Sequence, residues 1–548
     1  MMDSLRQISV KNVQSIANDG NEEKRAWIEH FRPHGFRHDT KEISRVSLPY
    51  GISYVLEVFL MPFVSQIFIS RLGQDEFNAC LLGQVCYGLS AYSINYGLSF
   101  GCDTLLSQCY SGNRRKMGLT IQRAAMIGGF SNLVSSILFL NSIYLIQYMN
   151  ISEQVYRLTQ QYITIGIFII PFDGLLVVIQ KYIINLGSTW SILIINIIGN
   201  MFNLLFHYVF LYVFKFGIRS APVSLALSYM SMIIMAFGYL KITKLYADSW
   251  QPITRNCLKE WLPYLKLAIP GVLILVREVI CFEGSVFLSS SFGKDSLSAQ
   301  GVSYYVYIIN YLMAQAFSLG GNILIGQYLG SNEPQKAYNA KKAMYLGGCI
   351  VLFIITAILY SIFYWIPNLY NLDKTSAASL SRHLLLFAIA FCAFNFVQVT
   401  QCGVMKAIGK QYIIGVLVLI NYIILTVPLA GLLVFYFKMK MYGYWIAIII
   451  GIILEIIIVE IYIARINWQT QAQITQVRVN FNTEEPSKSP VDNETNEVNM
   501  LNAETDEGVT TDSIQPTQTL FDVIKFKLII FMFLLSLLIV SIVFTVKH

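Results

Sequence analysis

The sequence predicts an all-α integral membrane protein with two pseudo-symmetric six-helix bundles in a parallel repeat and a C-terminal thirteenth transmembrane helix. The first observation is composition: 55% of the 548 residues are hydrophobic and only 13% are charged. The second is pattern, because the apolar residues fall in about thirteen runs, each long enough for the roughly 20 residues that cross a hydrocarbon core. Only helices or closed barrels satisfy their backbone in lipid, and runs of this length are typical of helices.

The third observation is an internal repeat. RLGQDEFNA at 71–79 resembles SFGKDSLSA at 291–299, and GCDTLLSQCYSGN from Gly101 resembles GGNILIGQYLGSN from Gly320, with offsets of 220 and 219 residues. Two matches in the same order indicate duplication. Six spans separate equivalent points, so both copies cross the membrane in the same sense. We therefore expect a pseudo-two-fold axis along the membrane normal, a binding cavity between or within the halves, and alternating access by rocking.

The first half of the chain begins with a polar segment, residues 1–47, which lacks the apolar core of a signal peptide and which we expect to be cytoplasmic. An N-lobe follows over residues 48–243, and a polar connection over 244–262 ends it. The six spans expected in this lobe are the apolar runs at 48–70, 79–105, 118–146, 155–182, 188–214 and 219–243.

The second half repeats this organisation in a C-lobe over residues 263–466. Residues 467–520, rich in Asn, Glu, Thr and Ser, predict a disordered, acidic cytoplasmic linker. The last segment, 521–548, holds an expected thirteenth span, a lipid-facing accessory helix without a catalytic role. The six spans expected in the C-lobe are 263–291, 297–329, 340–366, 379–405, 411–437 and 441–464.

Basic residues at the ends of the spans predict the orientation. Arg114, Arg115 and Lys116 follow the second span, and a further group of lysines begins with Lys336 after the eighth. Cytoplasmic loops carry an excess of Lys and Arg, so these turns and the N-terminus should be cytoplasmic. The thirteenth span then leaves the C-terminus outside, in either the plasma membrane or an endomembrane. The net charge of +7 consists mostly of such loop residues and does not indicate a nucleic-acid partner.

The seventh span carries charge at its centre, in Arg277, Glu278 and Glu283. A charged residue there costs roughly 2.5–3.5 kcal/mol on insertion scales, so such acids usually face a cavity or a partner. A carboxyl group held in that environment can take up and release a proton near neutral pH. The two acids are about 140° apart around an ideal helix, which predicts distinct roles, with one of them paired to Arg277 or to a neighbouring helix. The alternative is a structural ion pair that only ties helices together.

Other residues inside the spans are candidates for lining the cavity or assisting the site. Glu57 and Glu455 are intramembrane acids, and Gln300 and Tyr304 lie at the start of the eighth span. Tyr304, Tyr305, Tyr307 and Tyr311 could form a cation–π wall, although aromatic residues at helical spacing usually pack together. Asp103 is expected to cap a helix or meet Arg114, and Gly320 to allow close helix approach.

Several motifs resemble the multidrug and toxic compound extrusion (MATE) family over about residues 45–470. They are GLSFGCDTLLSQCYSG at 97–112, EVICFE at 278–283, VQVTQCGVMKAIGKQ from Val397, and GYW at 443–445. The resemblance implies two six-helix bundles in a V, which export organic cations or amphipathic compounds in exchange for protons. It also implies that Glu278 and Glu283 handle protons and bind cations, and the thirteenth span resembles that of animal-type members.

The chain departs from that family pattern at several positions, of which two concern acids of the C-lobe. Asn395 and Tyr305 stand where relatives commonly carry acids, so the cavity should be less negative and a preference for strongly cationic compounds is less expected. Glu455 and Glu57 offset this loss in part.

The sequence thus favours a secondary antiporter that exports organic, cationic or amphipathic small molecules by alternating access. Nine cysteines without a CxxC pair, and no phosphate loop or catalytic triad, predict neither a metal site nor an enzyme. We expect a monomer with small organic substrates and lipid as its partners, and no cofactor other than a proton gradient, with Na⁺ left open. The alternatives are a lipid or lipid-linked sugar flippase of related fold, and a non-transporting receptor or scaffold that uses the acidic linker.

Overall fold

The computed structural model describes residues 35–147, 152–253, 255–258, 261–366 and 376–480. Within these ranges every regular element is a helix. Predictions for residues 1–34, for the acidic linker beyond residue 480 and for the thirteenth span fall outside the described residues.

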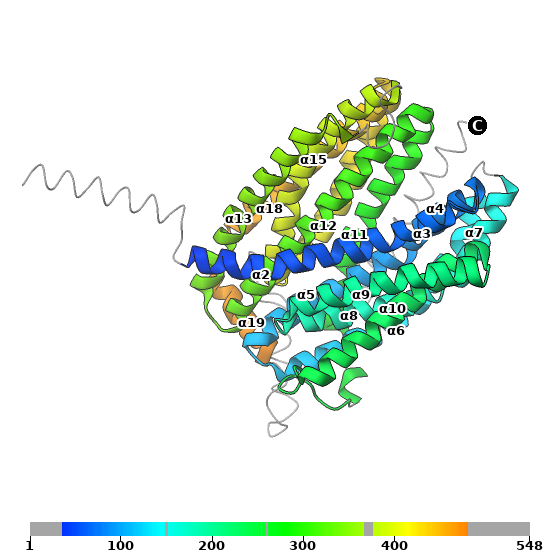
Figure 1. The fold of residues 1–548 in the computed structure, drawn as a ribbon. Helices are drawn as coiled ribbons and strands as arrows, with labels where there is room; N and C mark the ends of the chain where they lie inside the picture. Colours follow the sequence, from blue (N-terminus) through cyan, green and yellow to red (C-terminus); the bar gives the residue numbers. More distant parts are fainter. Residues whose placement is uncertain (1–34, 148–151, 254, 259–260, 367–375, 481–548) are drawn as a thin grey trace, which may run out of the picture. The chain divides into compact units, whose positions relative to one another are not determined.

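The helices up to residue 258 form the first half. Figure 1 shows α2, η1 and α3 as one continuous rod. The elements are α2 (Phe36–Tyr54), η1 (Val55–Leu60), α3 (Met61–Ile69), α4 (Gln74–Tyr87), η2 (Gly88–Tyr92), α5 (Ser93–Ser111), α6 (Arg115–Gln147), α7 (Glu153–Gly166), α8 (Ile169–Asn185), α9 (Thr189–Tyr208), η3 (Val209–Val213), η4 (Gly217–Arg219), α10 (Ser220–Thr243) and η5 (Arg255–Leu258).

The second half begins with α11, a helix of 30 residues, and α12, a helix of 37. Its elements are α11 (Trp261–Ser290), α12 (Lys294–Gly330), α13 (Pro334–Ile362), α15 (Ser376–Ala407), α16 (Gln411–Ile420), η6 (Asn421–Thr426), α17 (Val427–Gly431), η7 (Leu432–Tyr436), α18 (Lys440–Ala464) and α19 (Trp468–Asn480).

The membrane-spanning character of these helices follows from their length and hydropathy. In the described ranges nine helices are long and apolar enough to cross a membrane, or ten if α7 and α8, bent by 48° at their junction, form one span. Two predicted spans, α4–α5 and α11, are not among them. Both hold polar and charged residues that pack inside the protein, as described below.

Two helices widen into a π-helical turn just before a proline. Pro62 lacks the N–H that would donate to the carbonyl four residues earlier, and the N–H of Met61 donates to Leu56, five residues back. Pro428 has the same effect, with the N–H of Val427 donating to Tyr422. Such π-turns are frequent at functional sites, and these two carry Glu57 and Asn421.

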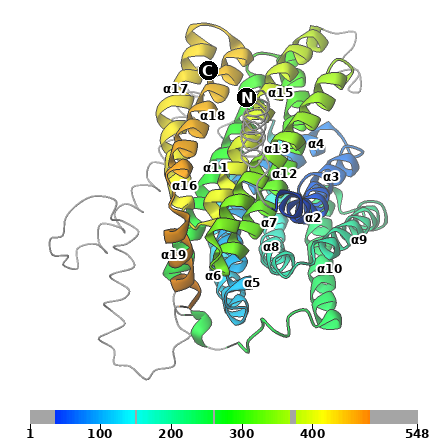
Figure 2. The ribbon, with the colours of Figure 1, turned by 90° about the vertical axis from the view of Figure 1, so that its left-hand side faces the viewer.

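The predicted linker is wrong at its start, because residues 468–480 form the helix α19. The side chain of Asn467 accepts hydrogen bonds from the backbone N–H groups of Gln469 and Thr470 (3.0 and 3.3 Å), which caps the helix. The Gln476 side chain donates to two carbonyl oxygens at the end of α12 (3.1 and 2.8 Å). Figures 1 and 2 show α19 beside the end of α5. A polar composition therefore hid a helix whose polar groups bond to α12.

The first helix also begins earlier than expected. The polar segment was expected to reach residue 47, but α2 begins at Phe36. Ile43 and Ser47 are buried there, and both lie against the α12 glycine Gly320. Packing on α12 thus extends α2 beyond its apolar run, and Gly320 permits close helix approach as predicted.

The two halves pack tightly at one end, which we call the basic end. It is formed by the α5–α6, α12–α13 and α15–α16 turns, which carry Arg114, Arg115, Lys116, Lys336 and Lys410. There α5 packs along α11 and α12, and α2 packs along α12.

Glycines make this contact close. A Cβ atom at Gly97 would fall on the backbone of Val272, one at Gly326 would fall on Ser107, and one at Gly330 would fall on the Gln108 carbonyl. From Gly97 to Gly112, α5 therefore contacts the second half over about 20 Å of helix, at a rise of roughly 1.5 Å per residue. We call this contact the seal.

The seal should be intolerant of small additions. Gly97→Ala places a methyl group against the Val272 backbone, and overpacking of this kind costs about 1–3 kcal/mol. We expect a lower apparent melting temperature for the purified variant in detergent. Gly129→Ala on α6, where a Cβ meets nothing within 4 Å, is the matched control and should be neutral or slightly stabilising. Equal melting temperatures for Gly97→Ala and the wild type would contradict this packing.

Candidate functional site

The acids of α11 occupy two different environments. Glu278 is buried, with 3% of its surface exposed, whereas Glu283 is half-buried. Their separation around the helix places Glu278 toward the interior of the second half and Glu283 toward Tyr304 on α12.

Arg277 lies between two acids inside the second half. Its Nη2 atom is 3.7 Å from Glu278 Oε1 and 3.7 Å from Glu455 Oε2 on α18. Glu455 also accepts hydrogen bonds from Asn421 in the η6 turn (2.6 Å) and from Gln398 on α15 (2.9 Å). All three charged side chains are at most 5% exposed. One cation thus serves two carboxylates and offsets one negative charge, and neutral donors from Asn421 and Gln398 complete the surroundings of Glu455.

Glu283 has a neutral partner instead. The Tyr304 hydroxyl donates to Glu283 Oε1 at 2.8 Å. The neighbouring ring of Tyr305 lies edge-on to Phe59 and Phe63 of the first half, with centroids 5.9 and 6.3 Å apart. Glu283 therefore lies beside aromatic residues at the boundary between the halves.

The four tyrosines do not form one wall. The Tyr307 ring stacks on Phe282 with centroids 3.6 Å apart, and Tyr311 accepts a hydrogen bond from Gln315 at 2.7 Å. Both are buried, so they pack and position neighbours. Tyr304 and Tyr305 remain the pair at the boundary.

Two predicted lining residues lie elsewhere in the second half. Gln300 donates to Ser285 at 2.9 Å and accepts from the Trp445 indole at 3.0 Å, which ties α12 to α11 and α18. Asn395 on α15 is fully buried, and neither of its amide atoms has a hydrogen-bond partner among the described residues. Neither side chain contacts the acids of α11.

Glu57 is the centre of a polar network in the first half. Its carboxylate, 2% exposed, accepts hydrogen bonds of 2.7 Å each from Tyr96, Gln180 and Asn196. The η1 turn brings Glu57 to these donors on α5, α8 and α9. A buried carboxylate can be held by neutral donors alone when several converge on it.

Asp173 on α8 is a second buried acid near Glu57. It accepts hydrogen bonds from the Tyr87 hydroxyl (2.7 Å) and from Asn95 (3.5 Å), and it interacts electrostatically with Glu57. The first half thus holds two acids in one polar interior.

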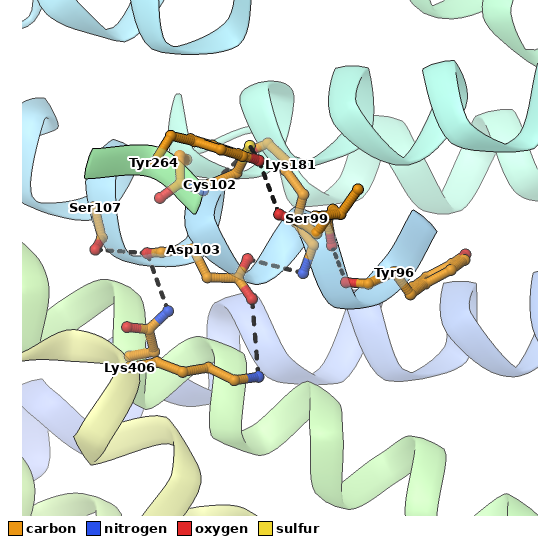
Figure 3. Close-up of polar contacts among 11 residues, drawn as sticks. Tyr96, Ser99, Cys102, Asp103, Ser107, Lys181, Tyr264 and Lys406 are labelled. Atoms are coloured by element: carbon orange, nitrogen blue, oxygen red, sulfur yellow. Dashed lines mark hydrogen bonds and ion pairs between the residues drawn. The ribbon is translucent and has the colours of Figure 1, made fainter. Parts of the chain in front are cut away.

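Asp103 joins the two halves through an ion cluster in the seal. Figure 3 shows its carboxylate between the amino groups of Lys181 from α8 and Lys406 from α15. The distances are 2.8 Å from Lys181 Nζ to Oδ1 and 4.0 Å from Lys406 Nζ to Oδ2. The expected partner, Arg114, instead lies over the Tyr110 ring at 4.1 Å. Asp103 therefore contacts lysines that the sequence places far away, and it does so at the interface between the halves.

Three residues of these clusters escaped the sequence-based prediction, namely Lys181, Lys406 and Asp173. Each is an ionisable residue within or at the end of an apolar run, which is the signal that identified Glu57 and Glu455. The signal was present, but nothing in one sequence says that a span-end lysine turns inward instead of reaching the membrane surface.

A family model described as MatE matches the chain over residues 49–209 and 270–432. The two stretches begin at positions separated by nearly the same offset as the internal repeat.

Among relatives, rabbit (Oryctolagus cuniculus) multidrug and toxin extrusion protein 1 is 27% identical over 460 residues, covering 84% of this chain and 81% of its own length. The human (Homo sapiens) protein of the same name is 27% identical over 427 residues, covering 78% and 75%. The crystal structure of the eukaryotic MATE transporter AtDTX14 superposes with a TM-score of 0.77 at 18% identity, covering 81% of this chain and 100% of that one. The helical arrangement is therefore that of a known transporter fold.

The Glu57 network should depend on acceptor geometry more than on charge. Glu57→Met removes an acceptor from three buried donors. Asn196 keeps Ser53 Oγ (2.7 Å) and Gln180 keeps a longer contact with Asn196 (3.4 Å), but the Tyr96 hydroxyl has no other acceptor in the described structure. An unpaired buried donor costs about 1–3 kcal/mol, so the apparent melting temperature should fall. Glu57→Gln should stay close to the wild type, because its carbonyl accepts from both amides and its NH₂ group donates to the Tyr96 oxygen. Thermal unfolding in detergent ranks the two variants. A Gln variant as unstable as the Met variant would show that the charge itself is needed.

Proposed function

The chain belongs to the MatE family of multidrug and toxin extrusion transporters, and from this premise we propose that it exports organic small molecules in exchange for protons. It is an integral membrane transporter and not an enzyme. The cargo class, the coupling ion and the direction of transport are the parts that we propose.

Glu283 is the observation that carries the proposal. It is the acid of α11 that has no basic partner within salt-bridge distance in the described structure and lies beside Tyr304 and Tyr305 at the boundary between the halves. A carboxylate there can attract a cation or hold a proton. If it does one at a time, entry of a proton releases the cargo and the two flows are coupled.

Glu278 has a supporting role in this proposal. Its charge is shared with Arg277, and it interacts electrostatically with Lys406 and with Tyr92 of the first half. The electrostatic energy of Glu278 therefore depends on the position of the first half, and its charge changes the electrostatic potential near Glu283. Glu283 itself binds the cargo.

The buried bases bear on the kind of cargo. Arg277, Lys181 and Lys406 offset much of the charge of the buried acids. Amphipathic compounds with one positive charge and an aromatic part fit this site better than strongly cationic ones, because Tyr304, Tyr305, Phe59 and Phe63 supply ring surface.

Orientation follows from the basic end. By the excess of basic residues in its turns this end is cytoplasmic, so the seal closes the cytoplasmic side. The opposite end has looser contacts between the halves, such as the Tyr305 ring against Phe59. Alternating access then requires the seal to open, and Glu283 becomes reachable from each side in turn.

The alternatives are less well supported. A flippase for anionic lipid-linked compounds requires a mainly cationic interior, whereas acids outnumber bases in the clusters described above. A receptor or scaffold without transport gives no reason for a half-buried acid between two movable halves.

Loss of the Glu283 carboxylate should abolish coupling. In proteoliposomes with a pH gradient, we expect Glu283→Gln to slow efflux of a fluorescent organic cation by about tenfold or more, which corresponds to roughly 1.4 kcal/mol. Glu278→Gln should reduce the rate less. The matched control is Glu153→Gln, an exposed acid paired with Arg157.

Unchanged efflux in Glu283→Gln would remove the proposed mechanism. If a Na⁺ gradient drives efflux and a pH gradient does not, the protein is still a secondary transporter, but its coupling ion is Na⁺ and not the proton.

The orientation can be tested by thiol labelling. Ser331→Cys lies exposed in the α12–α13 turn at the basic end, and Ser70→Cys lies exposed at the opposite end. A membrane-impermeant maleimide should label Ser70→Cys in intact cells that carry the protein at their surface, and Ser331→Cys only after permeabilisation. The reverse pattern would invert the proposed direction of transport.

A further inference from the structure

The seal contains one acid and two bases, from both halves of the protein. Asp103 and Lys181 belong to the first half, and their 2.8 Å contact lies within it. Lys406 belongs to the second half and reaches Asp103 at 4.0 Å. The three side chains are at most 5% exposed. The contact across the interface is therefore the longer of the two.

Lys406 is held to the first half only through α5 in the contacts described. Its ammonium lies 3.2 Å from the centroid of the Phe100 ring, and its backbone carbonyl accepts from Thr104 Oγ1 at 2.7 Å. The next carbonyl, that of Ala407, accepts from Gln108 at 2.7 Å. Separation of the halves at this end breaks all of these contacts together.

A second acid interacts with Lys406 from its own half. Glu278 on α11 lies within electrostatic range of the Lys406 ammonium, which it shares with Asp103. Glu278 thus adds a second, weaker negative charge to the field at Lys406, beside that of Asp103.

The use of two lysines for one acid has a physical reason. A single acid–base pair across the interface would leave two uncompensated charges in a low-dielectric interior when the halves separate. Here Asp103 keeps Lys181, and Lys406 has Glu278. Opening the seal therefore leaves each separated charge with an opposite charge in its own half.

We propose that Lys406 is the positioning residue that couples the α11 site to closure of the basic end: bound to Asp103 it holds the seal closed, and bound to Glu278 it lets the seal open. The proposal rests on the alternating access proposed above, but it concerns the seal and not the cargo. Loss of charge at Glu278 should favour the closed seal, and loss of charge at Lys406 the open one.

Native cysteines report on the seal without added labels. Cys102 is 0% exposed, and its Sγ atom lies 3.3 Å from the Tyr264 hydroxyl across the interface. Its rate of alkylation by N-ethylmaleimide, followed by mass spectrometry of the full-length protein in liposomes, measures opening. No substrate or ion gradient is needed, so the result does not depend on what is transported.

Opposite changes are expected in two variants. Lys406→Met should raise the Cys102 alkylation rate by about tenfold, as for the loss of one close charge pair, and Glu278→Gln should lower it below that of the wild type. Lys406→Arg should restore the wild-type rate. The matched control is Lys410→Met, a partly exposed lysine at the adjacent turn, 5.6 Å from the Tyr462 ring, which should change nothing.

Cys80 in the first half and Cys392 in the second are buried away from the seal and report unfolding. If alkylation of Cys80 and Cys392 also rises in Lys406→Met, that variant is misfolded. Thr104→Val then provides the test of the proposal, because it removes one hydrogen bond across the seal. In Thr104→Val, a higher alkylation rate at Cys102 alone supports the proposal, and an unchanged alkylation rate at Cys102 overturns it. An unchanged rate of Cys102 alkylation in folded Lys406→Met also overturns the proposal. An unchanged or higher rate of Cys102 alkylation in Glu278→Gln overturns the proposed link between the seal and α11.

Discussion

Charge buried in an apolar helix bundle needs a partner, and the interior of this protein is arranged around that need. An ionised side chain at the centre of a bilayer costs roughly 3 kcal/mol when it is isolated. The protein meets this cost in different ways: Asp103 has two lysines, Arg277 has two acids, and Glu57 has three neutral donors. Glu283 has a single hydroxyl donor. The acid with the weakest compensation is the one at the boundary between the halves.

This difference separates two residues that look alike in the sequence. Glu278 and Glu283 lie on the same helix, but one belongs to an ion network and the other to a cluster of aromatic rings. The network extends by electrostatic interactions from Glu57 through Lys181 and Asp103 to Lys406 and Glu278. A change of charge at one acid therefore alters the electrostatic potential at groups of both halves, whereas the partner of Glu283 in the described structure is Tyr304.

Much of the fold could be predicted from the sequence, because long apolar runs in lipid leave helices as the solution. The spacing of Glu278 and Glu283 predicted that they differ in surroundings, but not that Tyr304 would be the partner of Glu283. The partners of Asp103 could not be predicted, since Lys181 and Lys406 reach it only after distant helices pack. Helix α19 was missed for a related reason: its stabilising contacts are side-chain bonds to the end of α12, which composition does not reveal. The local sequence pattern thus predicts the helices, whereas the packing of helices that are distant in the sequence determines which polar side chains pair.

The glycine contacts of the seal restrict how the halves can move. At Gly97 the backbones of α5 and α11 meet without intervening side chains, and on the same face of α5 the bulky Phe100 lies against Gly271. Sliding α5 along α11 would drive the Phe100 side chain into residues of α11 larger than glycine. A hinge motion that lifts α5 away from α11 meets no such obstacle. The interface therefore resists shear between the two halves and permits them to separate by pivoting.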